Sequence, residues 1–157
     1  MRVWRLCRRS FAKQPLSGEG GLHASGRWHS APRLVVYASQ SLALASLELL
    51  VHVDVDLVPR DLVAIELDVP SPIHVAEFKV SELPRGWRRY PAPASLQKLG
   101  EEWLDCRQDA VLCVPSAIIP GERNYVINPK HPDILQIRVL GKTPFSFDPR
   151  LVAKRRG

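Results

Sequence analysis

The chain has 157 residues, an apolar fraction of 45%, a charged fraction of 24% and a formal net charge of +6 at pH 7. These values are typical of one soluble globular domain with its own hydrophobic core. No apolar run approaches the roughly 20 residues that a membrane-spanning helix needs, and no hydrophobic stretch of signal-peptide length follows the basic N-terminus. We therefore expect a cytoplasmic protein.

The cysteines and histidines exclude some kinds of site, and the charge distribution indicates possible binding partners. The three cysteines lack C-x-x-C spacing and the five histidines lack H-E-x-x-H spacing, so no disulfide framework and no metal site is expected. Positive charge is concentrated in residues 1–33, which hold seven Lys/Arg and one acidic residue. Such a segment suits a nucleic acid, a membrane surface, a pyrophosphate or an acidic protein partner, and charge alone does not decide among them.

Short apolar runs among fourteen prolines predict strands and irregular loops rather than a helical bundle. Two segments have the three-to-four periodicity of helices. One is capped by Ser39 or Ser41 and runs to about His52, and the other is capped by Ser95 and runs through Leu104. The predicted strands cover residues 3–7, 34–38, 61–69, 74–78, 110–114, 125–128, 134–140 and 145–147, with a Gly-rich flexible loop at 17–25 and a turn at 83–86.

Strands dominate this order of elements, and no linker or internal repeat divides the chain. This predicts a single α+β domain over residues 1–157 with a mainly antiparallel or mixed sheet. The basic end of the chain, residues 152–157, is expected to be a frayed tail.

Arg27 and Tyr37 are candidates for binding a ligand. Arg27 follows Gly26 just before a predicted strand, where its guanidinium could grip phosphate oxygens while the glycine lets a ligand approach the backbone. A plain surface arginine in a loop is the alternative. Tyr37 interrupts an apolar strand and could stack on a flat ring such as nicotinamide and donate a hydrogen bond to a ribose. Core packing with a satisfied hydroxyl is the alternative for Tyr37.

Three further polar residues are candidates. Glu48 shares a helical stripe with Leu44 and Val51, where an unpaired carboxylate is costly. It should therefore face a polar cavity, where it could stabilise an oxocarbenium-like centre, or pair with an arginine. Ser116 follows a strand and a proline without G-x-S-x-G context, which indicates a phosphate or sugar contact or a turn cap. Asn128 belongs to a polar cluster that mainly indicates turns.

Short motifs follow one another in order along nearly the whole chain, and their content and spacing carry a resemblance. In chain order they are Val3-Trp4-Arg5, Gly26-Arg27-Trp28, Val36-Tyr37, Leu47-Glu48, Leu83-Pro84-Arg85-Gly86-Trp87-Arg88, Val114-Pro115-Ser116, Asn124-Tyr125 and Phe147-Asp148-Pro149-Arg150. Together they resemble the RES-domain family of bacterial toxins. One departure is Ala31-Pro32, where family members usually show Pro-Gly.

The resemblance implies a fold similar to ADP-ribosyltransferases of the diphtheria-toxin type. It implies an enzyme that degrades NAD+ at the nicotinamide–ribose bond by phosphorolysis or hydrolysis. NAD+ is then a substrate, inorganic phosphate an optional co-substrate, and no bound cofactor is expected. The family's functional arginine, tyrosine, glutamate and serine fall on Arg27, Tyr37, Glu48 and Ser116, and NAD+ binding is expected from Arg27, Tyr37 and Asn128.

The resemblance also implies a partner. This would be a cognate antitoxin with an Xre-like helix-turn-helix domain that carries the DNA-binding function, and homodimers or a higher toxin–antitoxin assembly are compatible with it. Two other functions stay open at this point. One is a mono-ADP-ribosyltransferase that modifies a protein, and the other is a non-catalytic nucleic-acid-binding protein, suggested by the basic first third.

Overall fold

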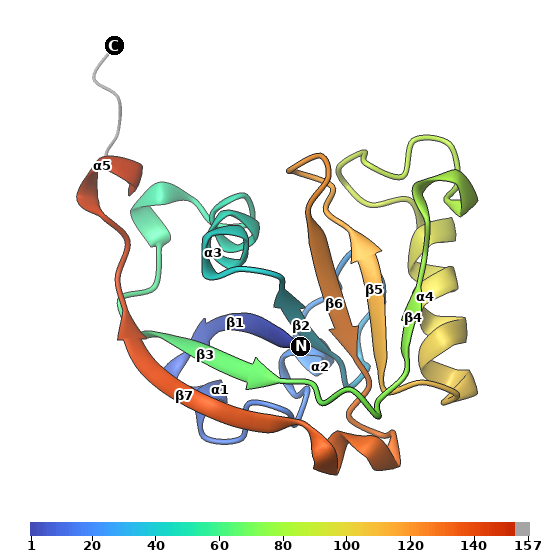
Figure 1. The fold of residues 1–157 in the computed structure, drawn as a ribbon. Helices are drawn as coiled ribbons and strands as arrows, with labels where there is room; N and C mark the ends of the chain where they lie inside the picture. The colour runs from blue at the N-terminus through green and yellow to red at the C-terminus, as the bar shows by residue number, and fades with distance from the viewer. Residues whose placement is uncertain (153–157) are drawn as a thin grey trace.

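One mixed sheet of seven strands forms the centre of the protein, in the order β4-β5-β6-β2-β1-β3-β7 (Figure 1). The β4–β5 pair is parallel and the other pairs are antiparallel, which confirms the predicted α+β class with a mixed sheet. The strands are β1 (Arg2–Arg8), β2 (Val36–Ser39), β3 (Leu62–Asp68), β4 (Val75–Glu77), β5 (Val111–Pro115), β6 (Arg123–Ile127) and β7 (Arg138–Phe145).

The computed structural model describes residues 1–152, so the expected frayed tail lies, apart from its first residue, outside the described residues. None of the helices in this range has both the length and the apolar character needed to cross a bilayer. The helices are α1 (Arg9–Ala12), α2 (Gly20–His23), α3 (Leu42–Leu50), α4 (Ala94–Cys106) and α5 (Pro149–Val152), with 3-10 turns η1 (Val55–Leu57), η2 (Val80–Glu82) and η3 (Pro132–Gln136).

The predicted N-cap is correct for α3 and wrong for α4. Ser41 caps α3, because its Oγ accepts the Leu44 N–H at 3.1 Å. The expected Ser95 cap of α4 is wrong, since the cap residue is Pro93 and Ser95 lies inside the first turn. Proline already has the φ that a helix start requires, and the Pro93 carbonyl accepts the first helical hydrogen bond from Leu96 at 2.9 Å.

Two loop expectations also change. The strand expected over residues 134–140 begins only at Arg138, because residues 132–136 form η3, whose start is capped by the His131 ring accepting the Asp133 N–H at 3.1 Å. β7 then runs on to Phe145 and takes in the start of the separate strand expected at 145–147. The Gly-rich segment at 17–25 contains the short helix α2.

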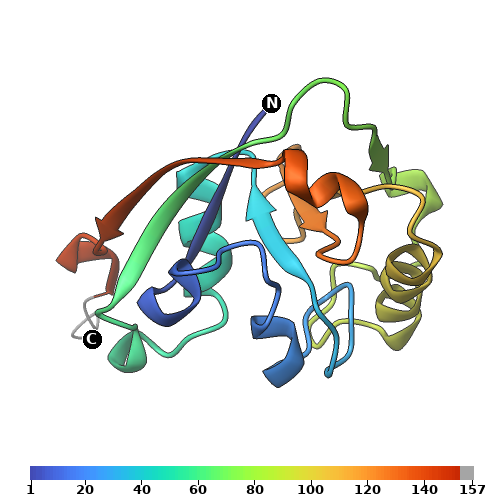
Figure 2. The same cartoon turned by 90° about the horizontal axis from the view of Figure 1, so that it is seen from below.

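Alternating strand residues supply hydrophobic clusters on the two faces of the sheet. α4 covers one face of β5 and β6, packing Leu96 and Trp103 against Leu112 and Val126. Both views place α4 on the outer side of this half of the sheet, whereas α3 lies near the middle (Figures 1 and 2). This leaves α3 beside the junction of β1 and β2.

The pairing between β1 and β2 is the shortest in the sheet. They share one paired position, Trp4 with Ser39, whereas β1 pairs with β3 at seven positions and β2 with β6 at four. Figure 1 shows β1, β3 and β7 diverging from β2, β6, β5 and β4. The two halves of the sheet therefore separate on one side of this junction, and the candidate site lies there.

Candidate functional site

A cavity of about 800 Å³ lies where β1 and β2 diverge. Side chains of both strands and of α3 line it, together with the turn at residues 24–29 and the loops around residues 88–90 and 115–118. Its size is in the range of small-molecule and cofactor sites. Arg27, Tyr37 and Glu48 all line this cavity, so the fold brings three of the predicted site residues to one place.

Glu48 is held by donors from two other elements. Its Oε1 accepts the Ser116 hydroxyl at 2.9 Å and the Asn124 side-chain amide at 2.5 Å. The Ser39 hydroxyl donates to the Asn124 Oδ1 at 2.6 Å and fixes the orientation of that amide. Within residues 1–152 no hydrogen bond engages Oε2 of Glu48. One carboxylate oxygen is therefore anchored, and the other remains available to a ligand in the cavity.

The sheet register explains why these partners converge. Ser39 ends β2 and lies directly opposite Asn124 at the start of β6. Ser116 follows β5 immediately, and β5 is the other neighbour of β6. Ser116 is 3% exposed, and its Oγ also accepts the N–H groups of Ile118 and Ile119 at 3.2 and 3.0 Å. Ser116 is thus both a turn cap and a hydrogen-bond donor to Glu48.

The hydroxyl of Tyr37 is engaged by the turn that precedes its strand. His29 Nε2 lies 3.0 Å from the Ala24 carbonyl oxygen, which only accepts, so we assign the ring proton to Nε2. Nδ1 must then accept, and the Tyr37 hydroxyl 2.8 Å away donates to it. The Trp28 N–H donates to the same hydroxyl at 3.3 Å. The expected hydrogen bond from Tyr37 to a ribose would require this proton, which His29 already takes.

Burial keeps this pair neutral. It raises the pKa of the Tyr37 hydroxyl, an effect that the Trp28 N–H and the charge of Arg27 only partly offset. It lowers the pKa of His29, against weaker opposing hydrogen bonds from the backbone. A neutral phenol and a neutral imidazole form the donor–acceptor pair that the distances indicate. Tyr37 therefore offers the cavity its ring rather than its hydroxyl proton.

Arg27 connects its turn to a second loop. Its Nη1 donates to the carbonyl oxygens of Trp87 at 2.6 Å and Arg89 at 3.1 Å. Burial lowers the pKa of Arg27, and the Glu48 carboxylate and Tyr37 counteract part of this. An arginine stays protonated under such a shift, so the cation persists. In the described part of the chain Nε and Nη2 have no hydrogen-bond partner, which leaves them for an anion.

Arg5 is a cation at the cavity that the sequence analysis did not select. Its Nη1 donates weakly to the Tyr37 carbonyl oxygen at 3.4 Å, and its buried Nε finds no hydrogen-bond partner in residues 1–152. The sequence could have indicated Arg5 by its position, because it is a charged residue within a strand, between Val3 and Cys7, which both belong to the core. Arg88 also lines the cavity, and its Nε donates to the Ala117 carbonyl at 2.9 Å.

Asn128 is not brought to this site. It is 1% exposed, its amide donates to the Leu104 carbonyl at 2.9 Å, and its Oδ1 accepts the Lys130 N–H at 3.0 Å. The bond to Leu104 ties the end of β6 to α4, the bond from Lys130 closes a local turn, and Asn128 does not line the cavity. The cluster's turn interpretation thus fits Asn128, whereas Asn124 of the same cluster reaches Glu48.

Five of the seven basic residues in the range 1–33 contact the cavity or an acidic side chain. Arg5 and Arg27 line the cavity, and three others form ion pairs with acidic side chains. Residues 1–152 also contain no group of three or more His, Cys, Asp or Glu side chains arranged for a metal ion. The ion pairs are Arg2–Glu66, Arg8–Asp61 and Arg33–Asp105.

Comparisons with known proteins identify relatives over the whole chain. The family model described as the RES domain matches residues 2–148. The protein named "Prs ADP-ribosylating toxin" from Sphingobium sp. is 35% identical over 156 residues, which is 96% of each chain. "Toxin Res" from Pseudomonas putida is 40% identical over 145 residues, covering 88% of this chain and 92% of the relative.

A solved structure shares the fold. It is a chain in the structure of the M. tuberculosis MbcT–MbcA toxin–antitoxin complex, with a TM-score of 0.72 and 17% sequence identity. The match covers 96% of this chain and 86% of that chain. At this identity the similarity establishes the architecture.

Proposed function

The chain belongs to the RES-domain family, and on that basis we propose that it is a toxin enzyme that breaks the nicotinamide–ribose bond of NAD+. The observation that carries this proposal is the anchored carboxylate of Glu48 in a cavity that Arg5 and Arg27 also line. A dinucleotide presents two negative phosphates and a ribose that becomes cationic during cleavage. The cavity offers the opposite charge for each.

Glu48 would act on the reacting ribose. Nicotinamide leaves NAD+ as a neutral molecule, so the reaction needs no general acid, and the barrier comes from positive charge developing at the ribose C1′. A carboxylate fixed before the reaction stabilises that charge without reorganising. Ser116 and Asn124 would hold Oε1 and leave Oε2 toward the sugar.

The cations and the tyrosine ring would place the substrate. Arg27 would bind the pyrophosphate through Nε and Nη2, since Nη1 already holds the loop at Trp87 and Arg89. Arg5 would contribute the guanidinium whose Nε lacks a partner among the described residues. The Tyr37 ring would pack against the nicotinamide. These assignments predict that charge at residues 5 and 27 governs affinity, whereas charge at residue 48 governs turnover.

The bond-forming partner at C1′ is either inorganic phosphate or water. Phosphorolysis yields nicotinamide and ADP-ribose 1″-phosphate, whereas hydrolysis yields nicotinamide, ADP-ribose and a proton. Mass spectrometry of NAD+ incubations with and without phosphate separates the two. Release of nicotinamide in either buffer supports the proposal, and intact NAD+ in both buffers after prolonged incubation with folded protein refutes it.

A second candidate function is mono-ADP-ribosylation of a protein. It is favoured by the similarity to the Sphingobium relative, which is named as an ADP-ribosylating toxin. The same cavity would serve this reaction, with a protein side chain as acceptor in place of phosphate or water. Incubation of the enzyme and a bacterial lysate with biotin-labelled NAD+ tests it. Labelled protein bands that disappear with Glu48→Gln would favour transfer over simple degradation.

We also propose a cognate antitoxin with an Xre-like helix-turn-helix domain as the partner in a bacterial cytoplasm. A solved chain of this fold belongs to a toxin–antitoxin complex. The simplest restraint is an antitoxin segment that fills the cavity and pairs an acidic group with Arg27. A purified complex should then release no nicotinamide. A tight complex that cleaves NAD+ at the rate of the free toxin would contradict this restraint.

A further inference from the structure

Arg27 lies at the tip of the tight turn Gly26–His29, whose two central residues, Arg27 and Trp28, have different surroundings. The Gly26 N–H donates to the His29 carbonyl at 3.0 Å and closes the turn. Trp28 is 3% exposed and packs in a hydrophobic cluster with residues of α4, whereas Arg27 is half-buried at the cavity. A Cβ at Gly26 would lie 2.6 Å from the Tyr37 hydroxyl, so the turn also fits closely against β2.

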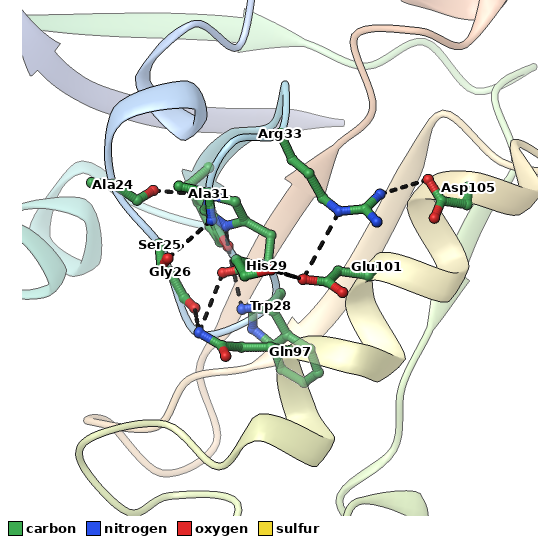
Figure 3. A network of polar contacts seen from close by, with 12 residues as sticks. Ala24, Ser25, Gly26, Trp28, His29, Ala31, Arg33, Gln97, Glu101 and Asp105 are labelled. Carbon is green, nitrogen blue, oxygen red and sulfur yellow. Dashed lines mark hydrogen bonds and ion pairs between the residues drawn. The ribbon is translucent and has the colours of Figure 1, made fainter.

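Helix α4 also contacts this turn. Gln97 Nε2 donates to the carbonyl oxygens of Gly26 at 3.0 Å and of His29 at 3.4 Å, the two ends of the turn (Figure 3). One helical turn further on, Glu101 Oε1 accepts the backbone N–H of Ser30 at 2.8 Å. Residues four apart share one face of a helix, so both side chains reach the same segment.

A third residue on this face of α4 touches the turn directly. Gly100 lies so close that a Cβ there would sit 2.1 Å from the Trp28 carbonyl oxygen, far inside contact distance. Helix and turn are therefore in backbone contact at the position between Gln97 and Glu101. The turn cannot move toward α4, and Gln97 keeps it from moving away.

We propose that Gln97 is a positioning residue that holds the Gly26–His29 turn and thereby fixes Arg27 for binding a pyrophosphate. This inference rests on the proposed use of NAD+, because it assigns Arg27 to the phosphates. Gln97 lies on the turn's carbonyls and not in the cavity lining. It acts through Arg27, so its loss weakens phosphate binding without removing the Glu48 carboxylate.

Substitution with an isosteric acceptor tests this arrangement. Gln97→Glu replaces the donating amide with an oxygen that faces two carbonyl oxygens, which pushes the turn away. Gln97→Lys keeps a donor at the end of a chain of similar length and should restore the contact. Lys98→Ala is the matched control, because Lys98 is the next helix residue, is exposed, and pairs only loosely with Glu102 at 3.9 Å.

Four quantities are measured for each variant: the melting temperature, the KM and the kcat for NAD+, and the Kd for ADP by calorimetry. Gln97→Glu should raise the KM and the ADP Kd about tenfold or more while kcat changes less than about threefold, the pattern of lost uniform binding. Gln97→Lys should stay within about threefold of wild type in all three constants, as should Lys98→Ala.

The outcomes separate this inference from the proposed reaction. A folded Gln97→Glu protein with wild-type KM and wild-type ADP affinity overturns the positioning role, even if NAD+ is cleaved. Weakened ADP binding in Gln97→Glu supports it, even if NAD+ is not a substrate. A wild-type protein that neither binds ADP nor cleaves NAD+ overturns both.

Discussion

Removing one oxygen atom, in Tyr37→Phe, distinguishes the two roles open to that hydroxyl. If the hydroxyl faces the substrate, its loss affects activity and leaves the fold intact. The structure instead places it between the His29 ring at 2.8 Å and the Trp28 N–H at 3.3 Å. We therefore expect the variant to lose stability.

The size of the loss follows from the bonds removed. Losing the bond to the Trp28 N–H costs about 1 kcal/mol net, and leaving the buried His29 acceptor without its donor costs about 1–3 kcal/mol. His29 is 2% exposed, so its Nδ1 is stranded away from water in Tyr37→Phe. We expect a loss of about 2–4 kcal/mol in the free energy of unfolding. In a domain of this size that lowers the melting temperature by about 5–15 °C.

Differential scanning fluorimetry and urea unfolding measure this loss, and Tyr90→Phe is the control because Tyr90 is 76% exposed and its hydroxyl meets solvent. The control should stay within about 0.5 kcal/mol of wild type. A Tyr37→Phe protein with an unchanged melting temperature and strongly reduced NAD+ cleavage would refute the structural role and return the hydroxyl to the substrate.

Three further predictions concern the groups around Tyr37 and Glu48. Ser116→Ala removes one donor to Glu48 Oε1 and the acceptor for the N–H groups of Ile118 and Ile119. The kcat should fall at least about tenfold and the free energy of unfolding by about 2–4 kcal/mol. An unchanged kcat in steady-state assays would contradict the anchoring role. Because burial lowers the pKa of His29, the unfolded chain takes up its proton first as pH falls; the stability that neutral His29 provides is complete above about pH 6.5 and lost below it. Urea unfolding at pH values from about 7 to 5 should therefore show that the free energy of unfolding falls less steeply with pH in His29→Gln than in wild type. Equal pH dependence in the two proteins would count against the assigned neutral pair. Arg27→Ala should raise the KM for NAD+ and also loosen the loop at Trp87 and Arg89, seen as faster hydrogen exchange there, whereas an unchanged exchange rate would mean that the Nη1 bonds do not hold the loop.

Local patterns made much of the fold predictable. The alternation in residues 61–69 marks β3, whose residues Leu62 and Ile65 are buried in the sheet, and Ser41 caps α3 as serine side chains do. Both signals depend on neighbours in the sequence. The same reasoning failed where two local signals competed, as at Pro93, where proline begins the helix ahead of Ser95.

The site was predictable only in part, because its contacts are long-range. The motifs named Arg27, Tyr37 and Glu48, and all three line one cavity. The sequence contained no sign that Ser39 and Asn124 lie opposite each other, since their pairing depends on the register of β2 against β6. Nor did it indicate that α4, about seventy residues further along, would supply the side chain that holds the turn of Arg27.

The central claim is that the anchored carboxylate of Glu48 drives cleavage of the nicotinamide–ribose bond. The most direct measurement compares nicotinamide release from NAD+ by wild type and by Glu48→Gln, with equal folding checked by circular dichroism. Glutamine keeps an oxygen for Ser116 and Asn124 but removes the charge. Loss of one preorganised electrostatic group should lower kcat by at least about a hundredfold. A folded Glu48→Gln protein that releases nicotinamide at the wild-type rate would contradict the account.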